Sequence, residues 1–419
     1  MDLLSKRTQA FVSIALALAL SKFLQESLYV MSYFMEKDFG ISASLIYETA
    51  KYQPLGVAVG YITTAFFVDR FGIKKMLAGS MLALSIALLG FSQNHNFSML
   101  LCYRMLIGMC IGCIYNCSFG ALPIIFNNEE LPRKTSLLYT FAFLAALIAP
   151  QSLTMTENIC SWRSLISFLS AITCFGGLYA FIVFPHKQGR MSLTQYCTQM
   201  RSLLKNKIFL LMIIVSTLCM GGFYGFVAIF INNLQQLGMS SEISKFIVTD
   251  MQFIGRLLLF IVTLIAGIKL TQKSIPFVLK AALSVMGISA LGLFVFLYST
   301  SSLFGHVQIL NYLSELASNH QHVFVPLISC FSGVYLFWVY AALIGAAQPA
   351  NKSKALSIAG KDMSGSAQAT LGFCLSIGEF IFAILASSAW PFGAYSFLMF
   401  IVLAASTVIL GLHKNKNDL

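Results

Sequence analysis

Apolar stretches long enough to cross a bilayer follow one another along almost the whole chain. A helix needs about 20 apolar residues to span the hydrocarbon core of a membrane, and the runs here reach that length between short polar connections. The pattern therefore predicts an all-α membrane protein with twelve transmembrane helices. The expected spans are residues 9–34, 46–68, 75–92, 97–122, 135–156, 163–184, 208–232, 243–267, 275–298, 323–348, 365–388 and 392–412.

The composition supports this prediction, because the chain has little polar surface to offer to water. Of its 419 residues, 58% are hydrophobic and only 10% are charged, and the mean hydropathy is +0.80. The first apolar stretch is too long, and too polar in its interior, for a cleaved signal peptide. We expect it to remain as the first span.

The net charge of +12 is compatible with nucleic-acid binding, but the positions of the basic residues indicate topology instead. Of the 27 lysines and arginines, 20 lie at the termini or in the connections that follow even-numbered spans, and four lie on the opposite side. Basic residues concentrate on the cytoplasmic side of membrane proteins. We therefore expect both termini in the cytoplasm, an even number of spans and no nucleic-acid partner.

Residues 185–207 form the one long polar stretch on the predicted cytoplasmic side, with five basic and no acidic residues. Six predicted spans precede this stretch and six follow it, which is typical of transporters built from two repeated halves. The expected organisation is an N-terminal six-helix half (1–184), a basic linker (185–207) and a C-terminal six-helix half (208–419).

Nothing in the pattern favours an enzyme. No stretch is long and polar enough for a soluble domain, and no nucleophile–base pair stands out. The phosphate-binding motif G-x4-G-K-[ST] is absent, so ATP is not expected as the energy source. We expect no cofactor and a chain that works as a monomer.

Three of the ten cysteines, Cys110, Cys113 and Cys117, form a C-x2-C-x3-C run in the fourth predicted span. This spacing raises the hypothesis of a metal site, but no histidine or carboxylate lies nearby in the sequence. Cysteine is also a small apolar residue suited to close helix packing in membranes. We expect packing rather than a metal site.

The connection after the second span, residues 60–76, reads GYITTAFFVDRFGIKKM. Its residues Asp69, Arg70 and Gly72 match the core of the signature loop of the major facilitator superfamily, which the chain resembles here. Glycine permits a tight turn between two helices, and an aspartate can lie at the N-terminus of another helix. We expect a gate that holds Asp69 near Ser364 and Gly365; the alternative is a basic loop that only sets topology. The family pattern is broken at two positions, Ala65 and Ile73.

Further matches lie in the fourth, fifth and eleventh spans. Arg104-x3-Gly108-x3-Gly112 matches a buried-arginine motif of the same superfamily, and Ala149-Pro150 stands where its antiporters carry a kink. Residues 361–390, KDMSGSAQATLGFCLSIGEFIFAILASSAW, resemble the corresponding helix of the MdfA and Bcr/CflA multidrug/proton antiporters. This resemblance implies the major facilitator fold and the inner membrane of a bacterium.

Two opposite charges, Lys22 and Glu26, lie inside the first predicted span, where a charge is costly. By the resemblance, Glu26 matches the outer of two acidic residues on the first helix of the MdfA-like group. Counting residues from the predicted span ends puts Glu26 at the depth of Arg104 in the fourth span. We expect Glu26, Arg104 and Lys22 to couple transport to protons. Two alternatives stay open: Lys22 only neutralises Glu26, or it binds an anionic substrate.

Other embedded polar residues are secondary candidates. Asp250, Arg256 and Glu379 are further charges inside spans, with either a structural or a second coupling role. Aromatic and amide residues of the helices that line the cavity in this fold are candidate substrate contacts, although such residues also serve packing. They are Tyr29, Tyr33, Tyr115, Asn116, Phe226, Phe230, Tyr335 and Trp338.

The leading hypothesis is a secondary active transporter that exports small organic molecules, such as drugs or toxic metabolites, in exchange for protons. The alternative on the same fold is a dedicated transporter of one metabolite, by siderophore export or by uptake of an amino-acid-like nutrient. Both hypotheses name a small molecule, protons and the lipid bilayer as the partners of the chain.

Overall fold

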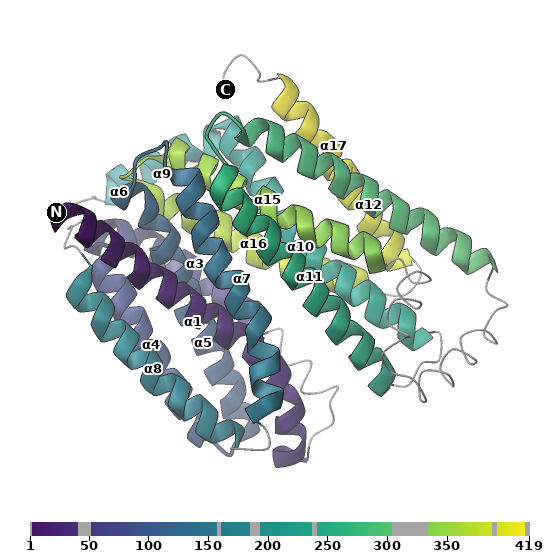
Figure 1. The fold of residues 1–419 in the computed structure, drawn as a ribbon, viewed down its shortest axis with the longest axis horizontal. Coiled ribbons are helices and arrows are strands. Elements are labelled where there is room, and N and C mark those ends of the chain that lie inside the picture. Colours follow the sequence, from purple (N-terminus) through teal and green to yellow (C-terminus); the bar gives the residue numbers. More distant parts are fainter. Residues whose placement is uncertain are drawn as a thin grey trace. The chain divides into compact units, whose positions relative to one another are not determined.

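A computed structural model describes residues 2–40, 52–156, 161–184, 193–236, 241–303, 334–387 and 392–414, and every element among them is a helix. The described part holds twelve long helices (Figure 1): α1 (Asp2–Phe39), α3 (Tyr52–Phe71), α4 (Ile73–Gln93), α5 (Phe97–Gly120), α7 (Leu131–Thr156), α8 (Trp162–Val183), α10 (Lys207–Gln236), α11 (Ser241–Lys269), α12 (Ile275–Leu303), α15 (Val334–Ala359), α16 (Ser364–Ser387) and α17 (Phe392–Lys414). Two shorter helices are α6 (Leu122–Ile125) and α9 (Leu193–Lys205).

Each predicted span coincides with one of these long helices, but the ends differ. Within the described residues, seven helices contain a window long and apolar enough to cross a membrane. The largest shift is in α15, which continues to Ala359, eleven residues past the predicted end at 348. Lys352 and Lys354, which we predicted in a connection, therefore lie in a helix. Residues 323–333 of the predicted tenth span lie outside the described part.

The reason for the longer α15 is that its polar residues face protein rather than lipid. Gln348, Asn351 and Lys352 lower the hydropathy, yet all three side chains are buried. The Asn351 amide donates hydrogen bonds to the Met212 carbonyl oxygen (2.8 Å) and to Ser216 Oγ (3.1 Å) of α10. Partners of this kind let a polar helix end stay folded inside the protein.

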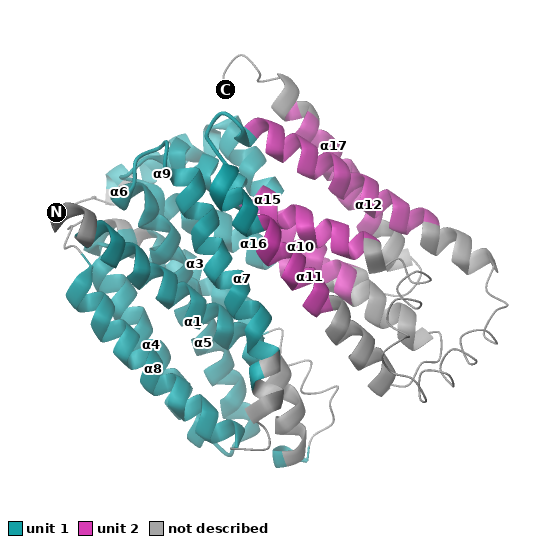
Figure 2. Cartoon of the chain, viewed as in Figure 1, with its two compact units in different colours: residues 1–216, 263–275, 349–377 teal, residues 217–262, 276–348, 378–419 magenta. Residues whose placement is uncertain are grey.

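Two compact units divide the described chain (Figure 2). Unit 1 comprises residues 1–216, 263–275 and 349–377, and unit 2 comprises residues 217–262, 276–348 and 378–419. Unit 1 thus joins the predicted N-terminal half to segments from the predicted C-terminal half. The division into two six-helix repeats stays a prediction.

Small residues allow α3 and α5 of unit 1 to approach closely. A Cβ atom added at Gly60 would clash with the Met109 backbone, and one added at Gly112 would clash with the Val57 backbone. Cys113 Sγ lies 3.7 Å from the Gly60 carbonyl oxygen at the same contact. The glycines of the R-x3-G-x3-G motif therefore serve close helix packing, which in membranes depends on small residues.

Serine side chains connect α4 and α8, which lie side by side in unit 1 (Figure 1). The Ser85 hydroxyl donates to the Ser170 carbonyl oxygen at 2.9 Å, and the Ser170 hydroxyl donates to the Ser85 carbonyl oxygen at 2.8 Å. Such reciprocal bonds hold helices together in an apolar environment, where few other partners are available.

Unit 2 has an aromatic core between α10, α15 and α17. The Phe226 ring lies 4.7 Å from the ring of Tyr340 and 5.7 Å from that of Phe397. The Tyr340 hydroxyl donates to the Leu218 carbonyl oxygen at 2.6 Å. Edge-to-face ring packing with a satisfied hydroxyl is the usual arrangement of buried aromatic residues.

Candidate functional site

The embedded charges of the first span form a buried polar group in unit 1. Lys22 Nζ lies 2.7 Å from Glu26 Oε1, one helical turn apart on α1. Lys22 Nζ also donates to Gln25 Oε1 at 3.4 Å, and the Tyr115 hydroxyl of α5 donates to the same oxygen at 2.8 Å. Side-chain exposures of 10% for Lys22 and 3% for Glu26 place this ion pair away from bulk water.

Burial changes how much this ion pair contributes to the stability of the protein. An exposed i,i+4 pair contributes only about 0.3–0.5 kcal/mol, whereas removing one partner of a buried pair costs about 3–5 kcal/mol because it leaves an uncompensated charge. Lys22 and Glu26 therefore depend on each other for their stability inside the protein. A change in the protonation of Glu26 must alter the polar group formed by Lys22, Gln25 and Tyr115.

Arg104 lies less deep in the helices than Glu26, which differs from our expectation. The Phe39 ring at the end of α1 is 6.2 Å from the Phe97 ring at the start of α5. Glu26 is 13 residues from Phe39 and Arg104 is seven from Phe97. At 1.5 Å per residue, Glu26 lies about 9 Å deeper than Arg104. The residue count failed because α1 extends beyond the predicted end of its span. The Arg104 side chain is 1% exposed.

Tyr115 and Asn116, two candidate substrate contacts, lie at the junction of α1, α3 and α5. The Tyr115 ring lies 6.5 Å from the Tyr61 ring. The Asn116 amide nitrogen donates to Thr64 Oγ1 at 3.1 Å, and the Thr64 hydroxyl donates to the Gly60 carbonyl oxygen at 2.6 Å. Asn116 Oδ1 is buried without a hydrogen bond among the described residues.

The signature loop forms the turn that its glycine predicts. Gly72 has a φ of 85° between α3 and α4, a conformation that residues with a side chain rarely adopt. The exposed Arg70 guanidinium lies 5.6 Å from the Phe71 ring. Asp69 belongs to α3, and its side chain lies outside the described part of the structure.

The N-terminal end of α16 contacts α3 and α5 in unit 1. The Ser364 hydroxyl donates to the Gly120 carbonyl oxygen at 2.8 Å, and the Ser366 hydroxyl donates to the Ala65 carbonyl oxygen at 3.4 Å. A Cβ atom added at Gly120 would lie 3.3 Å from Gly365 Cα. We name this contact, formed by Ala65, Gly120, Ser364, Gly365 and Ser366, the α16 seam. It lies one turn of α3 from Asp69.

Next to the α16 seam, Lys352 of α15 lies against two aromatic rings. Its Nζ is 4.5 Å from the ring centre of Phe119 on α5 and 5.8 Å from that of Tyr139 on α7. The two rings are 4.7 Å apart. Lys352 is only 1% exposed, and no carboxylate among the described side chains forms an ion pair with it. Its burial was not predicted, because Lys352 lies among the basic residues that the sequence pattern assigns to a cytoplasmic connection.

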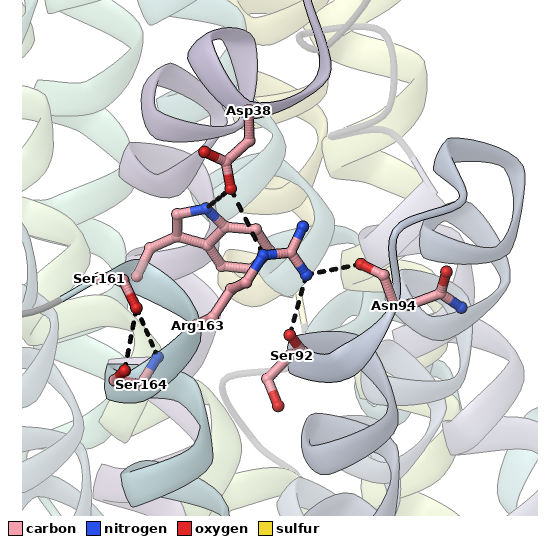
Figure 3. Close-up of polar contacts among 7 residues, drawn as sticks. Asp38, Ser92, Asn94, Ser161, Arg163 and Ser164 are labelled. Atoms are coloured by element: carbon pink, nitrogen blue, oxygen red, sulfur yellow. Dashed lines mark hydrogen bonds and ion pairs between the residues drawn. The ribbon is translucent and has the colours of Figure 1, made fainter.

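A second polar network joins the C-terminal ends of α1 and α4 to the N-terminal end of α8 (Figure 3). The Arg163 guanidinium donates to the carbonyl oxygens of Ser92 (2.9 Å) and Asn94 (2.6 Å), and lies 3.4 Å from Asp38 Oδ2. The Trp162 indole donates to the same carboxylate oxygen at 2.7 Å. This network fixes the end of α4 to α8 and to the end of α1.

The remaining candidates with described side chains belong to unit 2. Phe226 belongs to the aromatic core of unit 2. Arg256 Nη2 donates to Gln252 Oε1 of its own helix at 3.0 Å. Glu379, in unit 2, is buried, and Trp338 of α15 is half-buried. Five candidates lie in helices, but their side chains are outside the described part: Tyr29, Tyr33, Phe230, Asp250 and Tyr335.

Comparisons with known proteins identify both the family and the fold. The model of the Major Facilitator Superfamily matches residues 12–317. Among solved structures, the proton:xylose symporter XylE bound to 6-bromo-6-deoxy-D-glucose has 14% identity and a TM-score of 0.66, covering 96% of this chain and 95% of its own. The human organic anion transporter MFSD10 (TETRAN) has 11% identity and a TM-score of 0.66, covering 98% of this chain and 100% of its own. No curated protein matches the sequence.

The family match covers well over half of the chain, and the solved structures share its fold over nearly their whole length. The fold is that of an all-α membrane protein with twelve transmembrane helices, as the hydrophobic pattern predicted. Proteins of this fold are secondary transporters rather than enzymes. The chain belongs to the major facilitator superfamily.

Proposed function

We propose that this transporter exports small organic molecules in exchange for protons, and that Glu26 carries the coupled proton. The observation that carries the proposal is the buried ion pair of Lys22 and Glu26. A buried carboxylate binds a proton more readily, and a neighbouring cation opposes this. Glu26 can therefore alternate between an ionised state paired with Lys22 and a protonated state that releases Lys22.

The polar group around Glu26 offers a route from protonation to helix movement. Gln25 accepts hydrogen bonds from both Lys22 and Tyr115, so it connects the ion pair to α5. When Glu26 binds a proton, Lys22 loses its counter-ion and is left with neutral acceptors such as Gln25 Oε1. The contact between α1 and α5 then changes with each proton that is bound or released, which is what coupling requires. Arg104, in the same helix as Tyr115, is proposed to tune this step.

The α16 seam supports a gate at the cytoplasmic side. Basic residues near it, including Arg70, favour the cytoplasmic side for this end of the helices. Asp69 is one turn from Ala65 of the seam, so its carboxylate is proposed to stabilise the N-terminus of α16. In this proposal both termini are cytoplasmic and the protein works as a monomer in the inner membrane of a bacterium.

A second candidate function is the transport of one neutral or anionic metabolite. The observation that favours it is again Lys22, because a carboxylate already paired with a lysine attracts a lipophilic cation less strongly than a free carboxylate does. The solved structures of similar fold include a proton:xylose symporter and an organic anion transporter, so the fold is compatible with either class of substrate.

The test is proton flux in proteoliposomes with a panel of lipophilic cations, neutral amphiphiles and organic anions. The proposal expects several unrelated compounds to move protons in the opposite direction to the compound, and Glu26→Gln to abolish this flux. A response to a single metabolite, with protons moving in the same direction, would support the second candidate instead. Substrate movement that ignores the pH gradient would contradict proton coupling altogether.

A further inference from the structure

The α16 seam is a well-packed contact that a transporter must nevertheless break. Gly120 meets Gly365 backbone to backbone, and a Cβ atom added at Gly372 would clash with the Tyr61 ring. Ser364 and Ser366 add hydrogen bonds from α16 to α5 and α3. Alternating access requires the two sides of such a contact to separate in every cycle. A buried group that disfavours the closed seam would lower the free-energy cost of opening it.

Lys352 is a buried basic side chain beside the α16 seam. Its Nζ lies on the rings of Phe119 and Tyr139, and Phe119 is the neighbour of seam residue Gly120. At 1% exposure the ammonium has lost its water, and no described carboxylate replaces that water. Ring faces attract a cation, but burial without a charged partner disfavours the ammonium form, so the closed state bears the cost of burying or neutralising this amine.

A second buried polar side chain, that of Gln368, also disfavours the closed seam. Gln368, one turn along α16 from Gly365, is 0% exposed, and among the described residues neither its amide nitrogen nor its amide oxygen has a hydrogen-bond partner. Each buried polar group without a partner disfavours the state that buries it. Opening the contact would return both Lys352 and Gln368 to polar surroundings.

We propose that Lys352 favours release of the cytoplasmic gate: its amine lies on the Phe119–Tyr139 pair while the α16 seam is closed, and the cost of burying or neutralising that amine favours opening. This inference rests on the proposed function, because it needs a seam that opens during transport. It differs from the roles proposed for Glu26 and Asp69, since Lys352 binds neither substrate nor the coupled proton. It sets the equilibrium between the closed and the open seam.

The test measures seam opening directly and needs neither substrate nor a proton gradient. A cysteine placed by Ser366→Cys is labelled with a maleimide reagent, and site-resolved peptide mass spectrometry reads the label at that position alone. The native cysteines can therefore stay in place. In this background, Lys352→Met keeps the length of the side chain but removes its charge. We expect its labelling rate to fall roughly tenfold or more, since the removed charge opposes closure.

Matched variants separate the charge from other effects. Lys352→Arg keeps a cation that stacks on rings and should label like the parent. Lys354→Met removes a lysine two residues away that is not fully buried, and should also leave the rate unchanged. Phe119→Leu removes a ring face from the ammonium and should raise the rate, but only while Lys352 is present. Each variant is compared after its monodispersity in detergent has been verified.

Labelling of Lys352→Met at the parent's rate, or faster, would overturn the proposal, because the lysine would then not oppose closure of the seam. An equal effect of Lys354→Met would also overturn it, since net charge would be the cause. A failure of Glu26→Gln to uncouple protons would leave these labelling results unaffected. The proposed function and the release by Lys352 therefore fail in distinguishable ways.

Discussion

The Tyr115 hydroxyl donates a 2.8 Å hydrogen bond to Gln25 Oε1, and this links α5 to the residue that precedes Glu26. The bond crosses between two helices, whereas the Lys22–Glu26 ion pair lies within α1 alone. A local ion pair could be purely structural. A polar group that includes a second helix has a means of passing a change in charge to its neighbour.

The first prediction separates these two roles. Glu26→Gln should abolish proton-linked transport, because the glutamine mimics a permanently protonated glutamate. The measurement is proton release or uptake on addition of substrate in proteoliposomes. If the ion pair is only structural, the double variant Lys22→Met with Glu26→Gln should regain full activity, because replacing a buried pair by neutral groups is often neutral for stability. Persistent loss in the double variant supports coupling.

The second prediction concerns the cost of removing the lysine from the buried ion pair. Lys22→Met alone leaves Glu26 buried without its lysine, and we expect a loss of about 3 kcal/mol in the free energy of unfolding. Thermal unfolding in detergent should rank the double variant above the single one. The reverse order would show that water reaches the pair more freely than its burial suggests.

The third prediction concerns the glycine contact of α3 and α5. Gly112→Ala places a methyl group against the Val57 backbone, which cannot move aside as a flexible side chain would. We expect a loss of roughly 1–3 kcal/mol in stability from this overpacking. Gly79→Ala is the matched control, because an added Cβ atom there meets nothing within 4 Å. Equal melting temperatures for the two variants would contradict the close approach.

The fourth prediction concerns the network in Figure 3. Arg163→Met removes two charge-assisted hydrogen bonds to the carbonyl oxygens of Ser92 and Asn94, bonds of a type worth about 1.5–3 kcal/mol. Asp38→Asn should cost less, because Asp38 is 43% exposed and ion pairs near water contribute little. Thermal unfolding of both variants decides the order. A larger loss for Asp38→Asn would assign the stability to the ion pair.

The fifth prediction concerns the gate. Asp69→Asn should reduce transport, because the amide lacks the negative charge proposed to stabilise the N-terminus of α16. The melting temperature and substrate binding should stay close to those of the parent. Transport rates in vesicles and substrate binding in detergent give the two readouts. Unchanged transport would mean that the signature loop sets topology only.

Fluorescent tags at Leu419 and within 303–320 should report opposite sides of the membrane.

The sequence by itself determined the class of the protein and the number of its spans. Apolar runs of membrane-spanning length predict helices because the hydrocarbon core leaves no partner for an unpaired backbone group. The turn at Gly72 was predictable for a similar local reason, since only glycine readily adopts its φ of 85°. The superfamily followed from short motifs such as Asp69-Arg70 and Arg104-x3-Gly108, and the family match agrees.

The tertiary structure decided which polar residues share a site. Lys352 looked like one more basic residue of a cytoplasmic connection, and only the packing of α15 on Phe119 and Tyr139 shows it buried. Glu26 and Arg104 seemed level in the sequence, but their depth depends on where α1 and α5 meet, at Phe39 and Phe97. Residue counts fix distances along one helix. The offset between two helices is set by side-chain packing, which no single stretch of sequence contains.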